Sequence, residues 1–173
     1  MKEKGIDEYL EAAKVMKEKY PYTRFHIAGF FEEEYEDIIE DYQKKDIVHY
    51  HGMLKDIRSL LSETHCTVLP SYHEGMSNVL LESAASGRPV LASNVHGCIE
   101  TFDDNNSGYS FEPRNTKSLI EAMERFLALE HQEKKNMGLA GREKMEKEFD
   151  RQVVVNNYLE ELDKVVGKVL EVQ

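Results

Sequence analysis

Short apolar runs alternate along the chain with longer stretches in which apolar residues recur every three or four positions. The runs are typical of buried strands, and the longer pattern is typical of helices that turn one face to a core. The runs predict strands at residues 25–29, 47–52, 66–69, 90–93 and 108–111. Because strands and helices alternate, the sequence predicts an α/β fold with a parallel sheet and helices on both faces.

Helical periodicity fills most of the intervals between these runs. The first helix begins near Gly5 and ends at Tyr20, because a residue that precedes proline is pushed away from the α region. Further helical segments are expected at residues 32–45, 56–62 and 78–86, with a turn-helix at 97–102. Asp56 is a possible cap of the short third helix.

From Asn115 the pattern is helical to the end of the chain. The last stripe of apolar residues comprises Val154, Tyr158, Leu162, Val165 and Val169. Such a stripe needs a core, so we expect it either to fold onto its own domain or to stay exposed and promote self-association.

Size and composition indicate a single soluble domain. The chain has 173 residues, 40% of them hydrophobic and 32% charged, which suffices for one buried core. We take residues 1–173 as one domain, with 131–173 as a C-terminal helical extension. No apolar run approaches the roughly 20 residues of a membrane span, and no signal peptide is evident. These features favour a cytoplasmic location, with at most peripheral contact with the inner face of a membrane.

Charge and cysteine usage exclude several classes of function. The net charge of −11 argues against nucleic-acid binding, which depends on Lys and Arg contacts to phosphates. Cys66 and Cys98 lack metal-ligand spacing and are expected to be reduced thiols in the core. The histidines likewise show no tight ligand spacing, so no metal site is expected. Neither a P-loop nor a Gly-x-Gly-x-x-Gly motif is present.

The most informative stretch is residues 70–93, which reads as the end of a strand, a loop, a helix, a turn and a second strand. In an open α/β sheet, ligands bind near the carboxyl ends of strands, which places a candidate site near Glu74. Glu74 and Glu82 could border one elongated ligand, or both could be solvated surface charges. Ser77 could cap the helix, leave its amides for a phosphate, or do both.

These residues match a known signature. The sequence Pro-Ser-x-x-Glu-Gly-Met-Ser-Asn-Val-Leu-Leu-Glu-Ser-Ala-Ala-Ser-Gly-Arg-Pro resembles the Glu-x7-Glu motif of glycosyltransferase family 4. The resemblance extends over about residues 3–129, including Lys4-Gly5, Ala28-Gly29 and His51-Gly52. It implies a Rossmann-like domain that forms half of a GT-B fold. It also implies a retaining, metal-independent transferase of the kind that builds capsule or lipopolysaccharide chains.

The resemblance implies roles for three charged side chains. Glu82 would hold the ribose hydroxyls of the donor nucleotide, and Glu74 would contact hydroxyls of the donor sugar and orient it as the catalytic carboxylate. Lys4 would neutralise the diphosphate as it leaves. The alternative for Lys4 is a frayed lysine near a chain end.

Backbone groups are implied in the rest of the donor site. The donor is expected to be a nucleoside-diphosphate sugar, with a UDP-sugar favoured, and no cofactor or metal ion is expected. The segment 52–56 would meet the base. The implied donor-binding backbone positions are Gly75, Met76, Ser77 and Asn78 for the phosphate and sugar, and Gly52 and Leu54 for the base.

The chain also departs from the family pattern. Cys98 replaces a usual glycine, which puts the local backbone geometry in question. The acceptor-binding N-terminal domain of the family has no counterpart in these residues, so the chain alone is expected to bind donor and turn over little. Two alternatives remain: a non-catalytic nucleotide-sugar-binding or partner-subunit domain, and a nucleotide-sugar epimerase of the same architecture.

Overall fold

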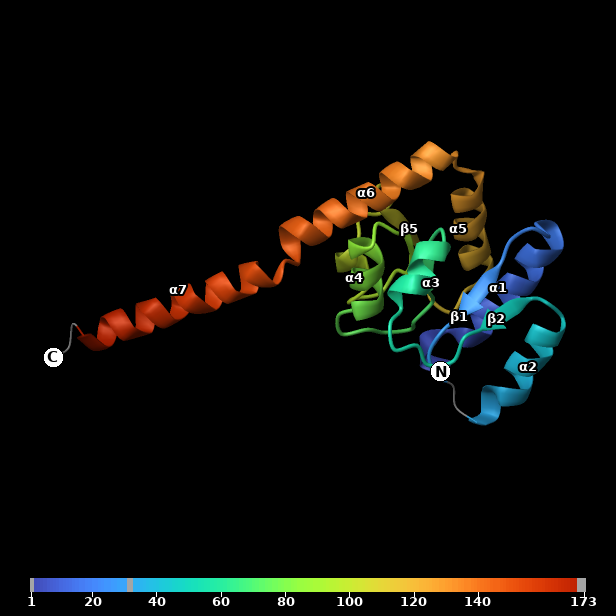
Figure 1. The fold of residues 1–173 in the computed structure, drawn as a ribbon, viewed down its shortest axis with the longest axis horizontal. Coiled ribbons are helices and arrows are strands. Elements are labelled where there is room, and N and C mark those ends of the chain that lie inside the picture. Colours follow the sequence, from blue (N-terminus) through green and yellow to red (C-terminus); the bar gives the residue numbers. More distant parts are fainter. Residues whose placement is uncertain (1, 31–32, 171–173) are drawn as a thin grey trace.

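The computed structural model describes residues 2–30 and 33–170, except for some side chains at Glu33 and in the last helix. Its elements, shown in Figure 1, follow the predicted alternation of strands and helices. Their bounds are η1 Lys2–Lys4, α1 Ile6–Lys19, β1 Phe25–Ile27, η2 Glu33–Tyr35, α2 Glu36–Lys44, β2 Val48–Tyr50, α3 Arg58–Glu63, β3 Thr67–Leu69, α4 Asn78–Ala85, β4 Val90–Ser93, η3 Ile99–Thr101, β5 Gly108–Phe111, α5 Thr116–Ala128, α6 His131–Glu148 and α7 Arg151–Leu170.

All strand pairs are parallel, as predicted, but their hydrogen bonds form two ladders. β1 pairs with β2, and β4 lies between β3 and β5. In the larger sheet, Val68 is opposite Leu91 and Leu91 is opposite Tyr109. The carboxyl ends of β3, β4 and β5 therefore meet at one edge, where loops can bring side chains together.

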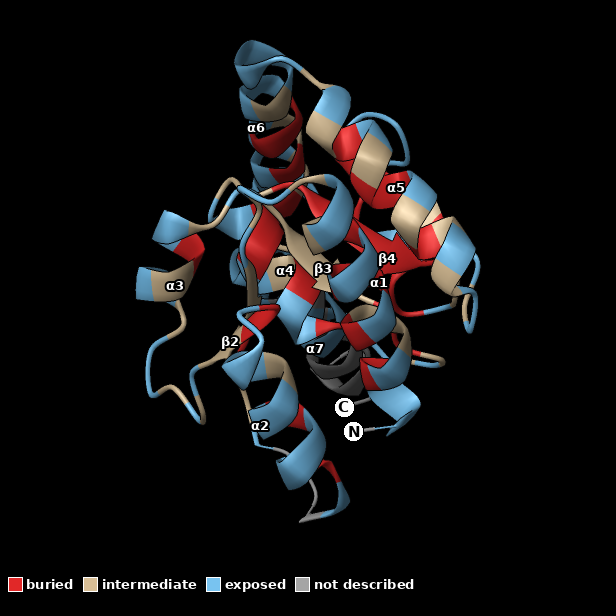
Figure 2. Cartoon of the chain, turned by 90° about the vertical axis from the view of Figure 1, so that its right-hand side faces the viewer, coloured by how far each residue is buried: buried red, intermediate tan, exposed pale blue. Residues whose placement is uncertain are grey.

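The two faces of the larger sheet can be read from β4, which is buried along its whole length. Leu91 packs into a cluster with residues of α1 and α5. Val90 and Ala92 pack into a different cluster with Leu80 of α4. Because successive side chains of a strand point to opposite faces, α1 and α5 cover one face and α4 covers the other. Figure 2 shows this buried interior between the helices.

Several predicted boundaries change in the structure. The strands predicted at 25–29 and 47–52 are shorter, at Phe25–Ile27 and Val48–Tyr50, and the predicted turn-helix at 97–102 is the 3₁₀ turn η3. The third helix begins at Arg58 instead of residue 56, and Ile57 is its N-cap. Asp56 stands one position earlier, where its carboxylate accepts a hydrogen bond from the Arg58 amide at 3.0 Å. The segment predicted as a helix over 32–45 begins as the 3₁₀ turn η2 and continues as α2, and residue 32 lies outside the described residues.

The predicted core thiols are confirmed as free cysteines. Cys98 is fully buried beside Leu80 and Val90. Cys66 is half-buried and packs against the cluster around Leu91. The backbone at Cys98, with φ −102°, suits an ordinary L-residue, so the expected disturbance from replacing a glycine is not present.

The C-terminal helices differ in how they are packed. α6 lies against α4, and Gly138 makes this close approach possible, since a Cβ atom there would lie 2.1 Å from the Gly87 carbonyl oxygen. α7 leaves the domain as a separate rod (Figure 1). Tyr158 and Leu162 of the predicted stripe are 70% and 57% exposed, while the side chains of Val154, Val165 and Val169 lie outside the described residues.

Within the described residues, no helix is both long enough and apolar enough to span a bilayer.

Candidate functional site

Glu74 stands at the centre of the candidate site, in the loop that joins β3 to α4. Its side chain is only 12% exposed. Oε1 accepts hydrogen bonds from Nζ of Lys4 at 2.7 Å and from Oγ of Ser71 at 2.8 Å. Oε2 accepts none from the described part of the chain, so it remains available as an acceptor for a ligand hydroxyl.

Lys4 reaches this loop because η1 docks against the end of β3. The Tyr72 amide donates to the Glu3 carbonyl oxygen at 2.9 Å. Gly5 has φ 69°, and a Cβ atom there would lie 2.1 Å from the Pro70 carbonyl oxygen. Only glycine fits such a left-handed and crowded position, which explains the Lys-Gly pair in the sequence. Lys4 is therefore paired in this structure, in contrast to the frayed alternative.

Gly97, after β4, supports the same loop from the other side. It has φ 79°, and a Cβ atom there would lie 2.5 Å from the carbonyl oxygens of Glu74 and Gly75. Its own carbonyl oxygen accepts a hydrogen bond from the Ser77 amide at 2.9 Å. The loop that carries Glu74 is thus fixed to the loop after β4 by backbone contacts.

The N-terminus of α4 faces the end of this loop. Ser77 is the predicted N-cap and is nearly fully buried, with its hydroxyl accepting from the Leu80 amide at 3.4 Å. The amides of Asn78 and Val79 find no acceptor among the described residues. Free amides in the first turn of a helix, together with the helix dipole, attract anionic groups. Gly75, Met76 and Asn78 are all exposed beside them.

Glu82 lies in the second turn of α4 and is exposed. Its carboxylate makes no hydrogen bond or ion pair within the described residues. No hydrogen bond joins it to Glu74 in the part of the chain that the structure describes. An exposed surface charge would look the same, so the geometry alone is compatible with both interpretations.

Gly52 and Leu54 lie in the loop that follows β2, a strand of the smaller sheet. Gly52 has φ 66°, and its carbonyl oxygen accepts from the Gly29 amide at 2.8 Å, which joins the loops after β1 and β2. No hydrogen bond or ion pair joins Gly52 or Leu54 to Glu74 in the described parts of the chain.

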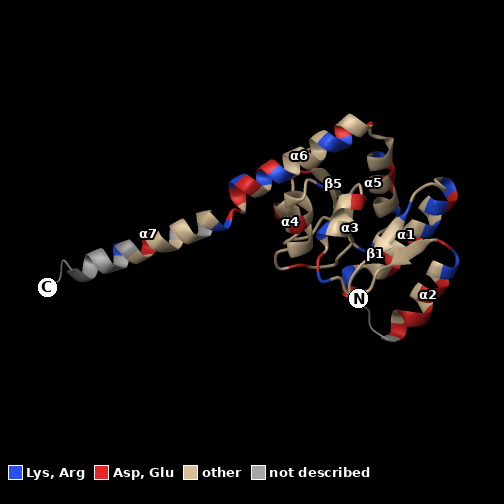
Figure 3. Ribbon diagram, in the orientation of Figure 1, with Lys and Arg blue, Asp and Glu red and all other residues tan. Residues whose placement is uncertain are grey.

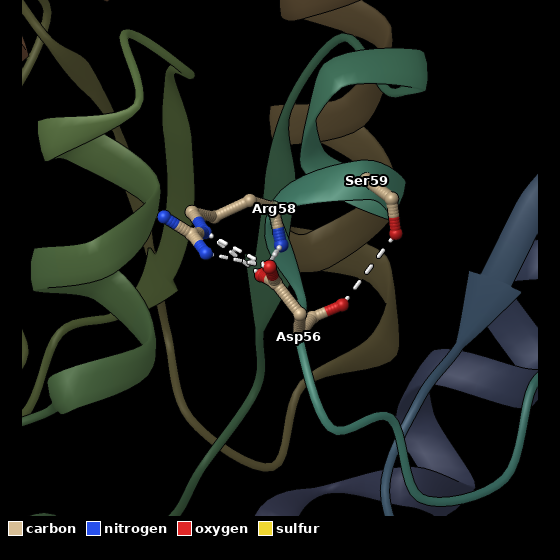
Figure 4. A network of polar contacts seen from close by, with 3 residues as sticks. All are labelled: Asp56, Arg58 and Ser59. Carbon is tan, nitrogen blue, oxygen red and sulfur yellow. Dashed lines mark hydrogen bonds and ion pairs between the residues drawn. The ribbon is translucent and has the colours of Figure 1, made fainter.

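Asp56 anchors the far end of the loop after β2. Figure 4 shows its carboxylate bound to the backbone and guanidinium of Arg58, with an ion-pair distance of 2.7 Å, and its carbonyl oxygen near Ser59. These hydrogen bonds from Arg58 lower the pKa of Asp56 to about 2. Among the described residues, Asp56 bonds only to Arg58 and Ser59, which are two and three positions away in the sequence. It is therefore a structural residue that shapes the start of α3.

Two residues near the site were not predicted as part of it. Ser71 is fully buried and donates a hydrogen bond to Glu74. Its position two residues after the end of β3 was the signal in the sequence that could have identified it. Tyr72 donates its hydroxyl to Glu8 at 2.8 Å, and the Arg114 guanidinium lies 4.4 Å from the centroid of its ring. Desolvation, followed by the Glu8 carboxylate, raises the pKa of Tyr72 to about 12. The phenol therefore stays protonated.

The surroundings of the site carry few concentrated charges. Asp and Glu residues are spread over α2, α6 and other helices rather than gathered at the loop (Figure 3). Residues 2–30 and 33–170 contain no group of three or more His, Cys, Asp or Glu side chains arranged to hold a metal ion.

The fold and the position of the site loop define the class of Rossmann-like α/β domains found in GT-B glycosyltransferases, as predicted. The family model for glycosyl transferases group 1 matches residues 1–144. The chain therefore belongs to this family.

Individual proteins agree with this assignment. The chain is 29% identical over 167 residues to the N,N'-diacetylbacillosaminyl-diphospho-undecaprenol alpha-1,3-N-acetylgalactosaminyltransferase of Campylobacter jejuni, covering 96% of this chain and 43% of that protein. It is 27% identical over 158 residues to the capsular polysaccharide biosynthesis glycosyltransferase CapM of Staphylococcus aureus, covering 89% and 41% of the two chains. The chain thus spans less than half the length of these relatives.

A solved structure shows the same fold. The crystal structure of Anabaena Alr3699/HepE, in complex with UDP and glucose, superimposes with a TM-score of 0.80 at 17% identity. The match covers 94% of this chain and 45% of HepE.

Proposed function

We propose that this chain is the donor-binding, C-terminal domain of a retaining, metal-independent transferase of glycosyltransferase family 4 that acts in polysaccharide or lipopolysaccharide synthesis. The observation that carries the proposal is the largely buried Glu74 carboxylate, held by Ser71 and Lys4 beside the free amides of α4. The UDP and glucose named for the HepE structure support a UDP-sugar as donor.

Each charged residue then has a distinct task. Glu74 accepts hydroxyl hydrogen bonds from the donor sugar through Oε2 and orients the anomeric carbon. Glu82 holds the ribose hydroxyls with its unpartnered carboxylate. Lys4 moves from Glu74 to the diphosphate, where its charge stabilises the leaving group.

Backbone groups complete the proposed donor site. The amides of Gly75, Met76 and Asn78 lie along the phosphate and sugar. The Ser77 amide donates to the Gly97 carbonyl oxygen and shapes the loop that presents them. Gly52 and Leu54 present backbone groups to the base. An acceptor domain elsewhere in the full-length protein supplies the acceptor site, so this domain alone turns over little or no donor.

Calorimetric titration with UDP, GDP, ADP and their sugars tests the proposal. We expect one of these nucleotides to bind with the same affinity whether or not EDTA is present. A folded sample that binds none of them would overturn the assignment of the site.

Two variants test the division of roles between the carboxylates. Glu82→Ala should weaken binding of the bare nucleotide by about tenfold, the loss of a charged hydrogen bond. Glu74→Ala should leave nucleotide affinity unchanged and remove the discrimination between sugars. Glu143→Ala, which changes an exposed carboxylate on α6, serves as the matched control. Equal losses of nucleotide and nucleotide-sugar affinity in both variants would contradict this division.

A further inference from the structure

A polar cavity lies on the smaller sheet and is lined by none of the residues assigned to the donor. Its volume is about 420 Å³. We call it the histidine pocket, and its lining residues are Lys17, Arg24, His26, Asp46, His49 and His51.

Strand alternation explains why three histidines meet there. Ile27 of β1 and Val48 of β2 turn inward to the core formed with α1 and α2. Their neighbours His26 and His49, which are opposite each other in the ladder, therefore point to the other face. His51 is two positions after His49 and points the same way.

The three imidazoles are in direct contact. Nδ1 of His26 lies 2.9 Å from Nε2 of His51, a hydrogen bond in which one nitrogen donates and the other accepts. The ring centroids of His26 and His49 are 5.4 Å apart and nearly stacked. A parallel sheet is normally covered on both faces, whereas His51 here is exposed. The face therefore presents imidazole groups to solvent.

Positive charge exceeds negative charge in this pocket, although the whole chain carries a net charge of −11. Asp46 is the one acidic residue of the lining, and it is shared by Lys17 at 3.1 Å and His49 at 3.5 Å. Arg24 is exposed, and its guanidinium makes no hydrogen bond or ion pair with any residue that the structure describes. Its five N–H donors are therefore available to a ligand.

The pKa of His26 is lowered, which agrees with the excess of positive charge in the pocket. Burial lowers its pKa first, and the nearby His51, His49 and Arg24 lower it further, while Glu63 at the end of α3 opposes them. A bound anion would offset the part of this shift that comes from His51, His49 and Arg24.

We propose that the histidine pocket binds a phosphate group, with the Arg24 guanidinium and the His26–His51 pair as its donors. A planar guanidinium matches two oxygens of a phosphate, and a dianion can satisfy Arg24 and a protonated imidazole at once. The cavity has room for the phosphate and the group to which it is esterified. The phosphate can come from a soluble sugar phosphate or from the headgroup of an anionic lipid.

The proposal has a defined dependence on pH. Because its pKa is lowered, His26 gains a positive charge at a lower pH than an ordinary histidine does. Phosphate binding should therefore strengthen as the pH falls toward the lowered pKa of His26, where the phosphate still carries a negative charge. Bound phosphate should in turn make His26 harder to deprotonate, because linkage is reciprocal.

The experiment is a histidine-resolved NMR titration of the full chain at constant ionic strength, with inorganic phosphate, a sugar 1-phosphate, and vesicles of phosphatidic acid or phosphatidylcholine. We expect the His26 and His51 resonances to shift with phosphate and the pKa of His26 to rise. Binding to phosphatidic acid vesicles without a response to soluble phosphates would assign the lipid headgroup as the source.

Three variants give the titration its controls. Arg24→Gln and His26→Gln should each weaken phosphate binding at least about tenfold, the value of a charged hydrogen bond. His131→Gln, at the start of α6, should leave it unchanged. If His26 in the folded wild-type chain responds to none of the probes, or if His131 responds equally, the proposal is wrong. UDP titration of the same samples is a separate readout, so failure here leaves the donor site untouched.

Discussion

Nζ of Lys4 lies 2.7 Å from Oε1 of Glu74, although 70 positions separate the two residues in the sequence. The pair is asymmetric, since the Lys4 side chain is 56% exposed and that of Glu74 is 12% exposed. A half-exposed ion pair contributes only about 0–1 kcal/mol, because water competes for both partners. Lys4 can therefore exchange Glu74 for a ligand phosphate at little cost.

Replacing Lys4 tests this exchange. In Lys4→Met we expect UDP to bind about tenfold more weakly and its affinity to depend less on salt, because one phosphate contact is lost. Isothermal titration at two salt concentrations measures both effects. Lys117→Met, which removes an exposed lysine of α5, is the control. Unchanged UDP affinity in Lys4→Met would exclude Lys4 from the diphosphate site.

The effect of the Ser71 hydrogen bond on Glu74 can be tested separately from the effect of burying Ser71. Ser71→Ala removes the hydrogen bond to Glu74 and should destabilise the fold by about 1 kcal/mol. It should also reduce the preference for one sugar over another without weakening UDP binding. Ser83→Ala removes a similar buried bond, 2.7 Å to Thr67, and should change stability alone. If both variants retain full sugar discrimination, Ser71 does not position Glu74.

Gly97→Ala should move the Glu74 loop. The new Cβ atom would meet two carbonyl oxygens at 2.5 Å, so we expect a loss of more than about 2 kcal/mol in the free energy of unfolding, together with weaker donor binding. Gly87→Ala is the matched control, with φ 70° but its nearest neighbour 4.0 Å away. Its cost should be about 1 kcal/mol, from the backbone conformation only. Similar urea midpoints for the two variants would contradict the proposed clash.

The exposed face of α7 should cause self-association. Tyr158, Leu159 and Leu162 are 70%, 53% and 57% exposed, so more than half of each apolar side chain faces solvent. We expect sedimentation velocity to show a larger species as concentration rises. Leu159→Gln together with Leu162→Gln should remove it, whereas Asn156→Gln should not. A wild-type chain that stays monomeric at high concentration would refute this expectation.

The two thiols should be unreactive in the folded chain. Burial raises the pKa of Cys66 to about 12 and that of Cys98 to about 11, in the second case assisted by the Glu74 carboxylate. At pH 8 the thiolate fraction of Cys98 is then about a hundredfold below that of an unfolded cysteine. Alkylation by iodoacetamide should be slower by at least that factor than in urea. Equal rates in the two conditions would show that the thiols are accessible.

The same shifts make stability depend on alkaline pH. Both thiols keep their protons to a higher pH in the fold than in the unfolded chain. Their stabilising contribution is therefore complete below the unfolded pKa near 9 and is lost as the pH rises through 11 to 12.

Much of the site was predictable because its signals are local. Ser77 caps α4 as its position suggested, and Glu74 stands at the end of a strand, where the alternation of elements placed it. The pairing of Lys4 with Glu74 was not predictable from spacing, because the close packing of Gly5 on Pro70 brings them together. In the sequence, a tertiary contact of this kind is visible only as a glycine at the position of close packing.

The histidine pocket shows the same limit more clearly. The sequence places His26 on one strand and His49 and His51 on another, with no ligand-like spacing. Only the parallel register, with His26 opposite His49, makes them neighbours. The apolar stripe of the last helix was likewise compatible with packing onto the domain and with exposure to solvent. The pattern of residues does not reveal whether another surface is available to pack against it.

The contact between Gly97 and the Glu74 loop bears on how mutational data for this family should be read. A scan scored by activity would mark residue 97 as essential, and proximity to the site would suggest that it touches a ligand. The structure offers a simpler cause, because any side chain there displaces the backbone that carries Glu74. Loss of activity on substitution at this position is explained by the lack of space between the two loops. It is not evidence that Gly97 contacts a ligand.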